Sequence, residues 1–275
     1  MRRTGKTALV AGASRPIGRA IARRFAAAGA ALVLPTHDWP EANAEMAEEF
    51  SQAGVPVVVM AADLRTEDEV ASLAETVRTR FGRLDLLINN IERGGMPVVH
   101  GSYAHPHNTG QWELEIATTL TAKRLLYRHF LPLLQASASA AVVNISSVAG
   151  LTGRSGPAGL IYSDGYSAAN RAVSSLTESW AREAGPAVRV NELALGLIQG
   201  RHGEGTRGWA ALDEGQRRDL LRHTLLGRTG TPEEVAEAVW FLAVEAAFMT
   251  GAVLRLDGGF VLGGDRVPAM PPGIL

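Results

Sequence analysis

The stretch Thr7-Ala-Leu-Val-Ala-Gly-Ala-Ser-Arg-Pro-Ile-Gly18, near the start of a 275-residue chain, joins an apolar run to a glycine turn. The run over residues 7–11 is short and apolar, which is typical of a buried strand. Beyond the turn, Ile21 and Phe25 are one helical turn apart, and Gly29 is placed as a C-terminal helix cap. These residues predict a strand, a tight turn and a helix in succession.

The same alternation of short apolar runs and helical segments continues along the chain. Further strands are expected at residues 31–34, 55–60, 84–88, 141–145, 188–193 and 252–256. Further helices are expected at residues 42–50, 67–81, 112–134, 166–183 and 233–244. Short apolar strands that alternate with helices indicate a parallel sheet buried on both faces. We therefore predict a Rossmann-like α/β fold, a doubly wound parallel sheet of about seven strands with helices on both faces.

The organisation of the chain is simple. We find no linker, internal repeat or low-complexity block, so residues 1–275 are expected to form a single domain. Three long connections stand out, at residues 91–111, 150–165 and 197–226. Connections at the C-terminal ends of parallel strands are where such folds place function, so these three segments are candidates for the site.

The composition excludes several classes of function. Hydrophobic residues make up 46% and charged residues 20%, as in soluble globular proteins. A net charge of −1 provides no basic field for nucleic acid or an anionic membrane. The chain has no cysteine, which excludes disulfides, thiolate metal sites and thiol nucleophiles. No apolar run approaches the roughly 20 residues of a membrane helix, and a cytoplasmic location is expected.

The glycine turn at residues 12–18 has the composition of an anion-binding site. Glycines let a phosphate approach backbone N–H groups at a helix N-terminus, where the helix dipole favours negative charge. The residues expected to contact a dinucleotide there are Gly12, Ser14, Arg15, Ile17 and Gly18. Pro16 is unusual, because proline supplies no N–H to a phosphate. Taken alone, the stretch is also compatible with a tight turn that binds no ligand.

The end of the second expected strand bears on the choice of dinucleotide. NAD-binding sheets place a carboxylate there on the ribose hydroxyls, whereas NADP-binding sheets use a cation. Thr36 stands where that acid is expected, and Arg15 and His37 are nearby and basic. Asp38 comes one or two positions later and weakens the distinction. The pattern favours NADP(H) over NAD(H).

Short motifs along nearly the whole chain resemble those of the short-chain dehydrogenase/reductase family. They are Ala11-Gly-Ala-Ser-Arg-Pro-Ile-Gly18, Asp63, Leu84-Asp-Leu-Leu-Ile-Asn-Asn90, Val143-Asn-Ile-Ser-Ser147, Tyr166-Ser-Ala-Ala-Asn170, Gly227-Arg-Thr-Gly-Thr-Pro-Glu-Glu234 and Leu256-Asp-Gly-Gly259. Each motif alone is weak, but their order and spacing together are specific. The resemblance implies a nicotinamide dinucleotide and a small carbonyl or alcohol substrate. It also implies a substrate lid around residues 197–226 and cofactor contacts at Asp63, Leu64, Asn90 and Asn170.

The resemblance assigns the proton chemistry to two hydroxyl groups. Ser147 is implied to hold the substrate oxygen, and Tyr166 to donate or accept the proton. Tyr162 competes for the role of Tyr166, although Gly165 interrupts the helix between them. The separation of Ser147 from Tyr166 is longer than is usual in the family. The excess lies in the glycine-rich residues 153–159, which we expect to loop outward.

Two positions depart from the family's catalytic pattern. Asn170 stands at the position of the family's lysine, and Thr119 at that of its asparagine. A free tyrosine has a pKa of about 10, and a nearby cation helps it to ionise. Lys6 precedes the first strand, and Lys123, one turn beyond Thr119, can reach the site only if its helix is rotated or bent. The change is expected to weaken alcohol oxidation, which needs a phenolate, more than carbonyl reduction.

Two functions are compatible with these residues. The first is an NADP(H)-dependent oxidoreductase that reduces a carbonyl or oxidises an alcohol, with Tyr166 as proton donor or acceptor. The second is a catalytically silent subunit that binds a dinucleotide or only supports an active paralogue. Ser147 and Tyr166 favour the first function, whereas Pro16, Thr119 and Asn170 favour the second. The resemblance implies a homotetramer or homodimer, or a hetero-oligomer with a paralogue.

Loop residues suggest two further hypotheses. Arg201 and Arg207 are candidates for holding an acidic group, and the alternative is a solvated loop with glycine hinges. His105 and His107 have a spacing that a metal could use, but no carboxylate is placed to complete such a site. We therefore expect no metal.

Overall fold

The computed structural model describes residues 5–91, 109–265 and 267–270. This part of the chain contains a sheet of seven parallel strands in the order β3-β2-β1-β4-β5-β6-β7. The strands are β1 (Thr7–Val10), β2 (Ala31–Thr36), β3 (Val57–Ala61), β4 (Leu86–Asn89), β5 (Ala140–Ser147), β6 (Val188–Leu195) and β7 (Val253–Leu256). The order reverses direction at β1 and β4, as in doubly wound sheets, so the predicted fold class is confirmed.

The two longest strands, β5 and β6, set the edge at which the site lies. They pair from Ala140 opposite Val188 to Ser147 opposite Leu195, each ending two residues beyond the predicted strand. All eight residues of β5 are buried. The extension places Ser147 in the last pair of the ladder, at the C-terminal edge of the sheet.

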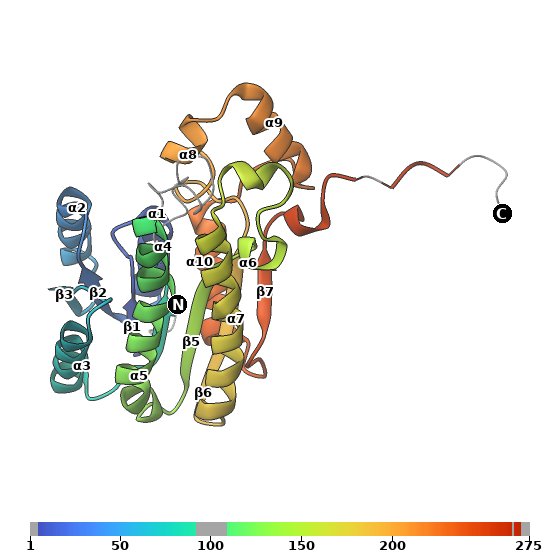
Figure 1. Cartoon of the computed structure of the whole chain (residues 1–275). Helices are drawn as coiled ribbons and strands as arrows, with labels where there is room; N and C mark the ends of the chain where they lie inside the picture. The colour runs from blue at the N-terminus through green and yellow to red at the C-terminus, as the bar shows by residue number, and fades with distance from the viewer. Residues whose placement is uncertain (1–4, 92–108, 266, 271–275) are drawn as a thin grey trace.

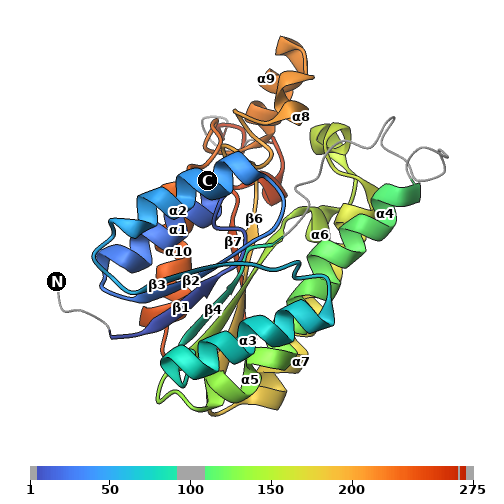
Figure 2. The ribbon, with the colours of Figure 1, turned by 90° about the vertical axis from the view of Figure 1, so that its left-hand side faces the viewer.

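Helices cover both faces of the sheet. The helices packed along the sheet are α1 (Pro16–Ala27), α2 (Pro40–Ser51), α3 (Glu67–Phe81), α4 (Thr109–Ile116), α5 (Ala122–Gln135), α7 (Asp164–Ala184) and α10 (Pro232–Trp240). α1, α2 and α10 lie on one face and α3, α5 and α7 on the other, with α4 continuing the line of α5 (Figure 2). None of the helices in the described ranges is long and apolar enough to cross a membrane.

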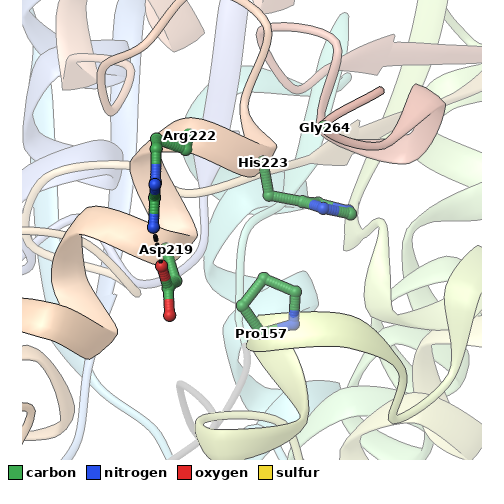
Figure 3. A pocket seen from close by; sticks show the side chains of 5 residues that line it. All are labelled: Pro157, Asp219, Arg222, His223 and Gly264. Carbon is green, nitrogen blue, oxygen red and sulfur yellow. Dashed lines mark hydrogen bonds and ion pairs between the residues drawn. The ribbon is translucent and has the colours of Figure 1, made fainter. Parts of the chain in front are cut away.

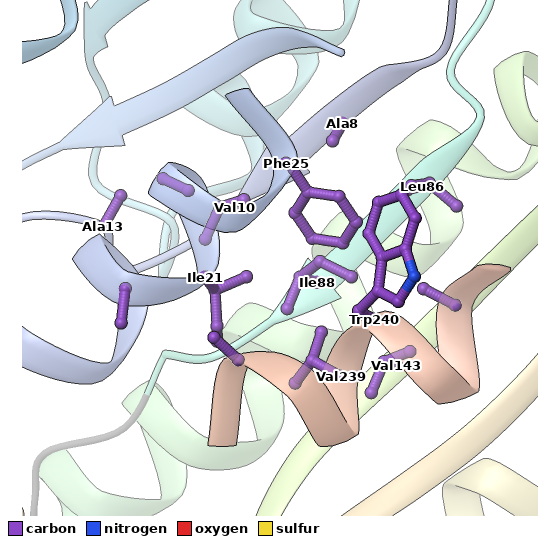
Figure 4. Packing of buried hydrophobic residues seen from close by; sticks show 14 of the residues in the cluster. Ala8, Val10, Ala13, Ile21, Phe25, Leu86, Ile88, Val143, Val239 and Trp240 are labelled. Atoms are coloured by element: carbon purple, nitrogen blue, oxygen red, sulfur yellow. The ribbon is translucent and has the colours of Figure 1, made fainter. Parts of the chain in front are cut away.

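Each face of the sheet buries its own apolar cluster. On the face covered by α1 and α10, the ring of Phe25 lies 5.7 Å from that of Trp240, above Ile88 of β4 (Figure 4). On the other face, Phe130 of α5 packs in a cluster with Leu87 of β4. Burying one such side chain contributes about 1.5–3 kcal/mol. The two layers together hold the strands in register and so fix the C-terminal edge.

The long helix predicted at residues 112–134 is interrupted. Between α4 and α5 lies a π-helical turn, η3 (Ala117–Thr121). Its widened register is seen where the N–H of Ala122 donates to the carbonyl of Ala117, five residues earlier. A π turn adds one residue to the helix, so the side chains beyond it are rotated by about 100° relative to an uninterrupted α-helix. Lys123 is the second residue after this turn.

Residues 197–226 lie over the C-terminal edge of the sheet, at the top of Figure 1. They contain two helices, α8 (Arg207–Ala210) and α9 (Glu214–His223). The glycine-rich segment predicted to loop outward instead forms a 3-10 turn, η4 (Gly156–Leu160), that packs against α9. Ala158 of this turn is fully buried, so apolar burial beneath α9 is the reason that the segment folds back.

Candidate active site

A groove of about 470 Å³ runs between the glycine turn and residues 197–226. This volume is in the range of cofactor and small-molecule sites. Most of the residues predicted to bind a dinucleotide line the groove, namely Gly12, Ser14, Arg15, Ile17, His37, Asp63, Leu64 and Asn90. The opposite wall includes Leu114 and Thr118 of the α4–η3 segment and Gly200, Arg201 and Thr206.

The glycine turn leaves no space for side chains at two positions. Gly12 has a φ of +68°, a conformation that L side chains rarely adopt. A Cβ added to Gly18 would lie 2.2 Å from the carbonyl oxygen of Gly12. Glycine at both positions therefore lets α1 begin close to the end of β1, with Pro16 in its first turn. The N-terminus of α1 borders the groove, where the helix dipole favours a phosphate.

Charged side chains gather beside the ends of β2 and β3. Arg65 donates two hydrogen bonds of 2.7 Å to the carboxylate of Asp63, and its Nη2 lies 3.0 Å from Nε2 of His37. The hydrogen bonds from Arg65 are the main reason that the pKa of Asp63 is lowered. Arg65 is not among the predicted site residues. A cation two residues after the Asp63 motif is the signal that could have indicated it.

Arg15 and Trp39 lie against each other at the same end of the groove. The guanidinium carbon of Arg15 is 4.6 Å from the centroid of the Trp39 ring, within the range of a cation–π contact. Trp39 has a left-handed φ of 68° immediately before α2. The sequence contains no signal for this conformation. Arg15, His37 and Arg65 together place three basic groups around Thr36.

Tyr166 is fully buried near the start of α7. The helix begins two residues before the predicted start because Ser163 caps it, its hydroxyl oxygen accepting a hydrogen bond from the Tyr166 N–H. The Tyr166 hydroxyl lies 2.8 Å from Nε2 of His202, which is 4% exposed. His202 is not among the site residues predicted from the sequence. The two residues are 36 positions apart, and no local pattern indicates their contact.

Ser147 and Tyr162 are buried in the same region. Ser147 ends β5, and its hydroxyl accepts a hydrogen bond of 3.2 Å from the Ala149 N–H. The rings of Tyr162 and Tyr166 are stacked with 5.8 Å between centroids. Tyr162 precedes α7, and its ring lies edge-on to that of His202. Because the Tyr166 hydroxyl meets the imidazole nitrogen, Tyr166 remains the better candidate for the proton donor.

Two buried polar atoms lie on the neighbouring elements η3 and α7. Within the part of the chain that the structure describes, Oγ1 of Thr119 and Oδ1 of Asn170 have no hydrogen-bond partner. The Asn170 amide is held by its Nδ2, which donates to the Tyr166 carbonyl at 2.9 Å. A buried polar atom without a partner costs about 1–3 kcal/mol. Neither residue lines the groove, so the contact of Asn170 with a ribose hydroxyl stays a prediction.

The π turn directs Lys123 into the interior of the protein. Its side chain is fully buried, and its ammonium donates to the carbonyl of Ile91, a residue that lines the groove. Burial raises the pKa of Glu192 on β6, while hydrogen bonds from two serine hydroxyls and the charge of Lys123 oppose that rise. The helix is thus rotated in the way that Lys123 needs in order to approach the site. The Lys123 ammonium lies at the carbonyl of Ile91. The family's lysine, by contrast, would stand on α7 at position 170.

The first part of the 197–226 segment is packed against the protein. Arg201 and His202 are buried, so the alternative of a solvated loop is wrong for these residues. The carbonyl of Ile198 accepts hydrogen bonds from the N–H groups of Arg201, His202 and Gly203. Nη2 of Arg201 lies 3.5 Å from the carbonyl oxygen of Ser146, at the edge of the sheet. This part of the segment closes the groove.

Three predicted loop residues lie outside what the structure describes. They are His105, His107 and, for its side chain, Arg207. The hypotheses that concern them remain predictions.

The chain is similar to known proteins over nearly its full length. A family model described as enoyl-(acyl carrier protein) reductase matches residues 12–261, from the glycine turn to beyond β7. The chain belongs to the short-chain dehydrogenase/reductase family. It is 35% identical to the cis-4-hydroxycyclohexanecarboxylate dehydrogenase of Sinomonas cyclohexanicum, over 93% of this chain and 96% of that protein. It is 31% identical to the 3-oxoacyl-(acyl-carrier-protein) reductase of Thermotoga maritima, over 95% of this chain and 100% of that protein.

A solved structure from Burkholderia xenovorans, assigned by its name to the short-chain dehydrogenase/reductases, has the same fold. The two structures superimpose with a TM-score of 0.80 and 29% identity, over 94% of this chain and 99% of the other. The protein is therefore an oxidoreductase of this family that uses a nicotinamide dinucleotide, a group that supplies or accepts a hydride when bound. The groove beside the tight turn at Gly12 and Gly18 fits such a group.

Proposed function

We propose that the protein is an NADP(H)-dependent carbonyl reductase in which Tyr166 protonates the substrate oxygen and Ser147 holds it. The observation that carries this proposal is the buried Tyr166 hydroxyl, which meets His202 next to the groove residue Arg201. Ser147 supplies a second hydroxyl at the same edge of the sheet. A positioned general acid of this kind contributes about 10²–10⁴-fold to a rate.

The charges near Tyr166 support reduction as the favoured direction. Reduction needs a neutral phenol as the acid, whereas oxidation needs a phenolate as the base. Asn170, one helical turn after Tyr166, is uncharged and gives a phenolate no ionic stabilisation. The ammonium of Lys123 is directed to the carbonyl of Ile91. Loss of the α7 cation therefore affects reduction less than oxidation.

The basic groups around Thr36 support NADP(H) over NAD(H). Arg15 and Arg65 are permanently charged, and His37 lies within hydrogen-bond distance of Arg65. Guanidinium groups suit a ribose phosphate because they form paired charge-assisted hydrogen bonds with its oxygens. Asp38 is largely exposed and lies 3.6 Å from His37. Its carboxylate is thus drawn toward a basic neighbour, which reduces its effect on a bound phosphate.

The substrate is inferred to be a small ketone that carries a carboxylate or an acyl thioester. Arg201 provides a cation in the groove wall beside Leu114 and Thr118. The Sinomonas relative is named for a hydroxycyclohexanecarboxylate and the Thermotoga relative for a 3-oxoacyl group. Both names describe an oxygen-bearing carbon a few bonds from an acyl or carboxyl carbon.

The enzyme is further inferred to act in the cytoplasm as a homodimer or homotetramer. Large apolar side chains are exposed between the end of α10 and the turn after β7, namely Phe241, Phe248, Val253 and Leu262. Exposed apolar residues that recur along one segment are typical of subunit interfaces. With a net charge of −1, no nucleic-acid partner is expected. The whole chain is inferred to be one domain with residues 197–226 as its substrate lid.

Titration and turnover with the purified protein test this proposal. Binding of NADPH and NADH is measured by fluorescence, and oxidation of NADPH is followed with 4-oxocyclohexanecarboxylate and an acetoacetyl thioester. We expect tighter binding of NADPH than of NADH and turnover of at least one of the two ketones. Binding of neither nucleotide would refute the proposal.

The substitutions at Thr119 and Asn170 favour a second candidate, a catalytically silent subunit. In that case the protein binds the dinucleotide but turns over no carbonyl alone, and it supports an active paralogue in a hetero-oligomer. Cofactor binding without turnover, together with loss of a partner's activity when this chain is removed from a native complex, would favour this function.

A further inference from the structure

His202 contacts the reacting hydroxyl of Tyr166 directly. Its Nε2 lies 2.8 Å from the Tyr166 oxygen, in a buried hydrogen bond in which either atom can donate. The imidazole ring is edge-on to the ring of Tyr166, with centroids 5.0 Å apart, and to that of Tyr162, at 5.4 Å. Two aromatic rings therefore fix the orientation of the imidazole, and one of its nitrogens is directed at the candidate proton donor.

The backbone that carries His202 is firmly anchored. The carbonyl of Ile198 accepts hydrogen bonds of 3.1 Å from the N–H of His202 and 2.9 Å from that of Gly203. A Cβ added to Gly203 would lie 2.8 Å from Cγ2 of Thr229, so the turn fits closely on the next segment. Ile198 also pairs with Gly230 in an isolated bridge. The position of His202 is thus set by the fold.

The same turn rests on the dinucleotide-binding loop. Gly200 has a φ of +75°, and a Cβ added there would lie 2.8 Å from Cγ of Pro16. Pro16 is the residue of the glycine turn that has no N–H for a phosphate. Its ring instead supports the lid two residues before His202. The contact of Gly200 with Pro16 and the contact of His202 with Tyr166 are therefore made by one packed turn.

We propose that His202 is the proton-relay partner of Tyr166. This inference rests on the proposed reductase function. A tyrosine hydroxyl has one hydrogen to donate and two lone pairs to accept with. Tyr166 can therefore accept a hydrogen bond from His202 Nε2–H while it gives its own hydrogen to a substrate carbonyl. Imidazole suits this role because its protonation changes near neutral pH.

The relay delivers one proton to the substrate oxygen for each carbonyl that is reduced. The O–H bond of Tyr166 breaks, and its proton forms the O–H bond of the product alcohol, leaving a phenolate. The Nε2–H bond of the protonated His202 then breaks, and this proton restores the phenol. His202 is left neutral and regains a proton from water when the product departs. In this scheme the positive charge beside the phenolate comes from the lid, since position 170 of α7 holds an uncharged asparagine.

Substitution of His202 tests the relay in the full-length enzyme with NADPH and the ketone that the wild type reduces. His202→Gln keeps an N–H group but cannot exchange a proton, and His202→Ala leaves space for free imidazole. We expect kcat to fall by about 10²-fold in both variants, with KM and the NADPH Kd within about threefold of wild type. Added imidazole should restore His202→Ala and leave His202→Gln unchanged.

The pH profile provides a readout that a purely structural role would not change. The titratable or charged side chains of this region include Tyr162, Tyr166 and the adjacent Arg201. They also include the buried carboxylate of Glu115, which accepts hydrogen bonds from Ser163 beside Tyr162. Tyrosine and arginine ordinarily titrate at about pH 10 and above. A limb of the kcat profile near neutral pH that disappears in His202→Gln and persists in Glu115→Gln is therefore due to the imidazole.

His223 offers a matched control in the same lid. It lines a surface pocket with Pro157, Asp219 and Arg222 (Figure 3), and its ring contacts Phe260. His223→Gln should leave kcat and its pH profile unchanged. Wild-type kcat in both His202 variants, or His202→Ala that imidazole fails to restore, would overturn the relay. A wild-type enzyme that reduces no carbonyl would instead refute the proposed function.

Discussion

The two ends of the candidate site hold their polar side chains in different ways. At the end near β2 and β3, His37 and Arg65 are partly exposed, and Arg65 pairs with Asp63, its neighbour in the sequence. At the other end, Lys123, Tyr166 and His202 are buried outside the groove lining, and their contacts join segments 32 and 36 positions apart. The first end combines a local ion pair with a contact between Arg65 and His37, 28 positions apart, on partly exposed side chains. The second depends on how buried side chains of distant segments pack.

This difference bears on the uncharged residue at position 170. Most buried polar groups have a hydrogen-bond partner, and the Tyr166 hydroxyl has one in His202, which comes from a distant segment. In this protein, the interrupted α4–α5 helix and the lid both bring a basic side chain toward the region. Substitutions at the two ends should therefore change different measured quantities.

The largest expected effect is on turnover at the catalytic end. Tyr166→Phe removes the proton donor and should lower kcat by about 10³-fold, while the NADPH Kd changes little. Tyr162→Phe is the control, because the adjacent stacked ring keeps its position. Steady-state kinetics and fluorescence titration measure the two quantities. A loss of turnover in Tyr162→Phe with retention in Tyr166→Phe would reverse the assignment.

At the glycine turn we expect a substitution to weaken NADPH binding, the quantity that Tyr166→Phe leaves nearly unchanged. Gly18→Ala places a methyl group 2.2 Å from the carbonyl oxygen of Gly12, so the loop must move. We expect NADPH affinity to fall by about 10–100-fold and the melting temperature to decrease, since overpacking costs about 1–3 kcal/mol. Gly110→Ala on α4 is the control, because no atom lies within 4 Å of the added Cβ. Equal NADPH affinity in both variants would show that this turn does not bind phosphate.

A lysine at position 170 would restore the cation that is missing from α7 at the catalytic end. Asn170→Lys should raise alcohol oxidation by about tenfold and carbonyl reduction by less, because a nearby ammonium stabilises the phenolate. Asn170→Gln, which adds length without charge, is the control. The ratio of the two rates at saturating cofactor is the measurement. An equal change in both directions would show that position 170 is not coupled to the proton transfer.

A smaller effect is expected for the choice of dinucleotide. Arg15→Gln removes a guanidinium beside Trp39 and should weaken NADPH binding about fivefold, with little change for NADH. Arg23→Gln lies on the same helix, pairs with Glu49 and serves as the control. Competitive titration of the two nucleotides gives the ratio. If both nucleotides weaken equally, Arg15 contacts a part that they share.

The smallest effect concerns stability away from both ends. Glu234 belongs to the capping box of α10 with Thr231, and hydrogen bonds, mainly from Arg228, lower the pKa of Glu234 to about 2. Because the folded-state value is below the unfolded one, this stabilisation is present above about pH 4.5 and is lost as the pH falls toward 2. The side chain is 42% exposed, so solvent screening keeps the effect small.

Glu234→Gln keeps the cap but not the charge. The difference in unfolding free energy between wild type and this variant should therefore shrink as the pH falls from about 4.5, as measured by denaturation at several pH values. Glu245→Gln is the control, because the Glu245 carboxylate follows α10 and accepts a hydrogen bond from the Trp240 indole and not from an arginine. A difference that is constant with pH would show that Arg228 does not act on this carboxylate.

The fold and the dinucleotide groove could be predicted because their signals are local. Short apolar runs, glycine spacing and helix periodicity each depend on neighbours in the sequence, and the predicted α3 has the observed bounds Glu67–Phe81. Ser147 and Tyr166 follow from motifs placed at the ends of such elements. The residues predicted around the glycine turn line one groove for the same reason.

The missed features depend on packing between distant segments. The contact of His202 with Tyr166 needs the turn at Gly200 and Gly203 to fit against two other segments, which no pattern near His202 reveals. The π turn at η3 holds three threonines in five residues, which are weak helix formers. Threonines alone do not indicate an added residue, so the π turn is visible only in the hydrogen bonds. Arg65 could have been noticed from its place two positions after Asp63.

The π turn has a consequence for how this scaffold can acquire new chemistry. Removing one residue between Ala117 and Thr121 would restore an even helical register and swing Lys123 away from Ile91 by about 100°. A single-codon insertion or deletion in that helix could therefore bring a charged group to the reaction centre or withdraw it, without exchanging any amino acid. Length variation inside a regular element is thus a second route, beside substitution, by which such enzymes can diversify.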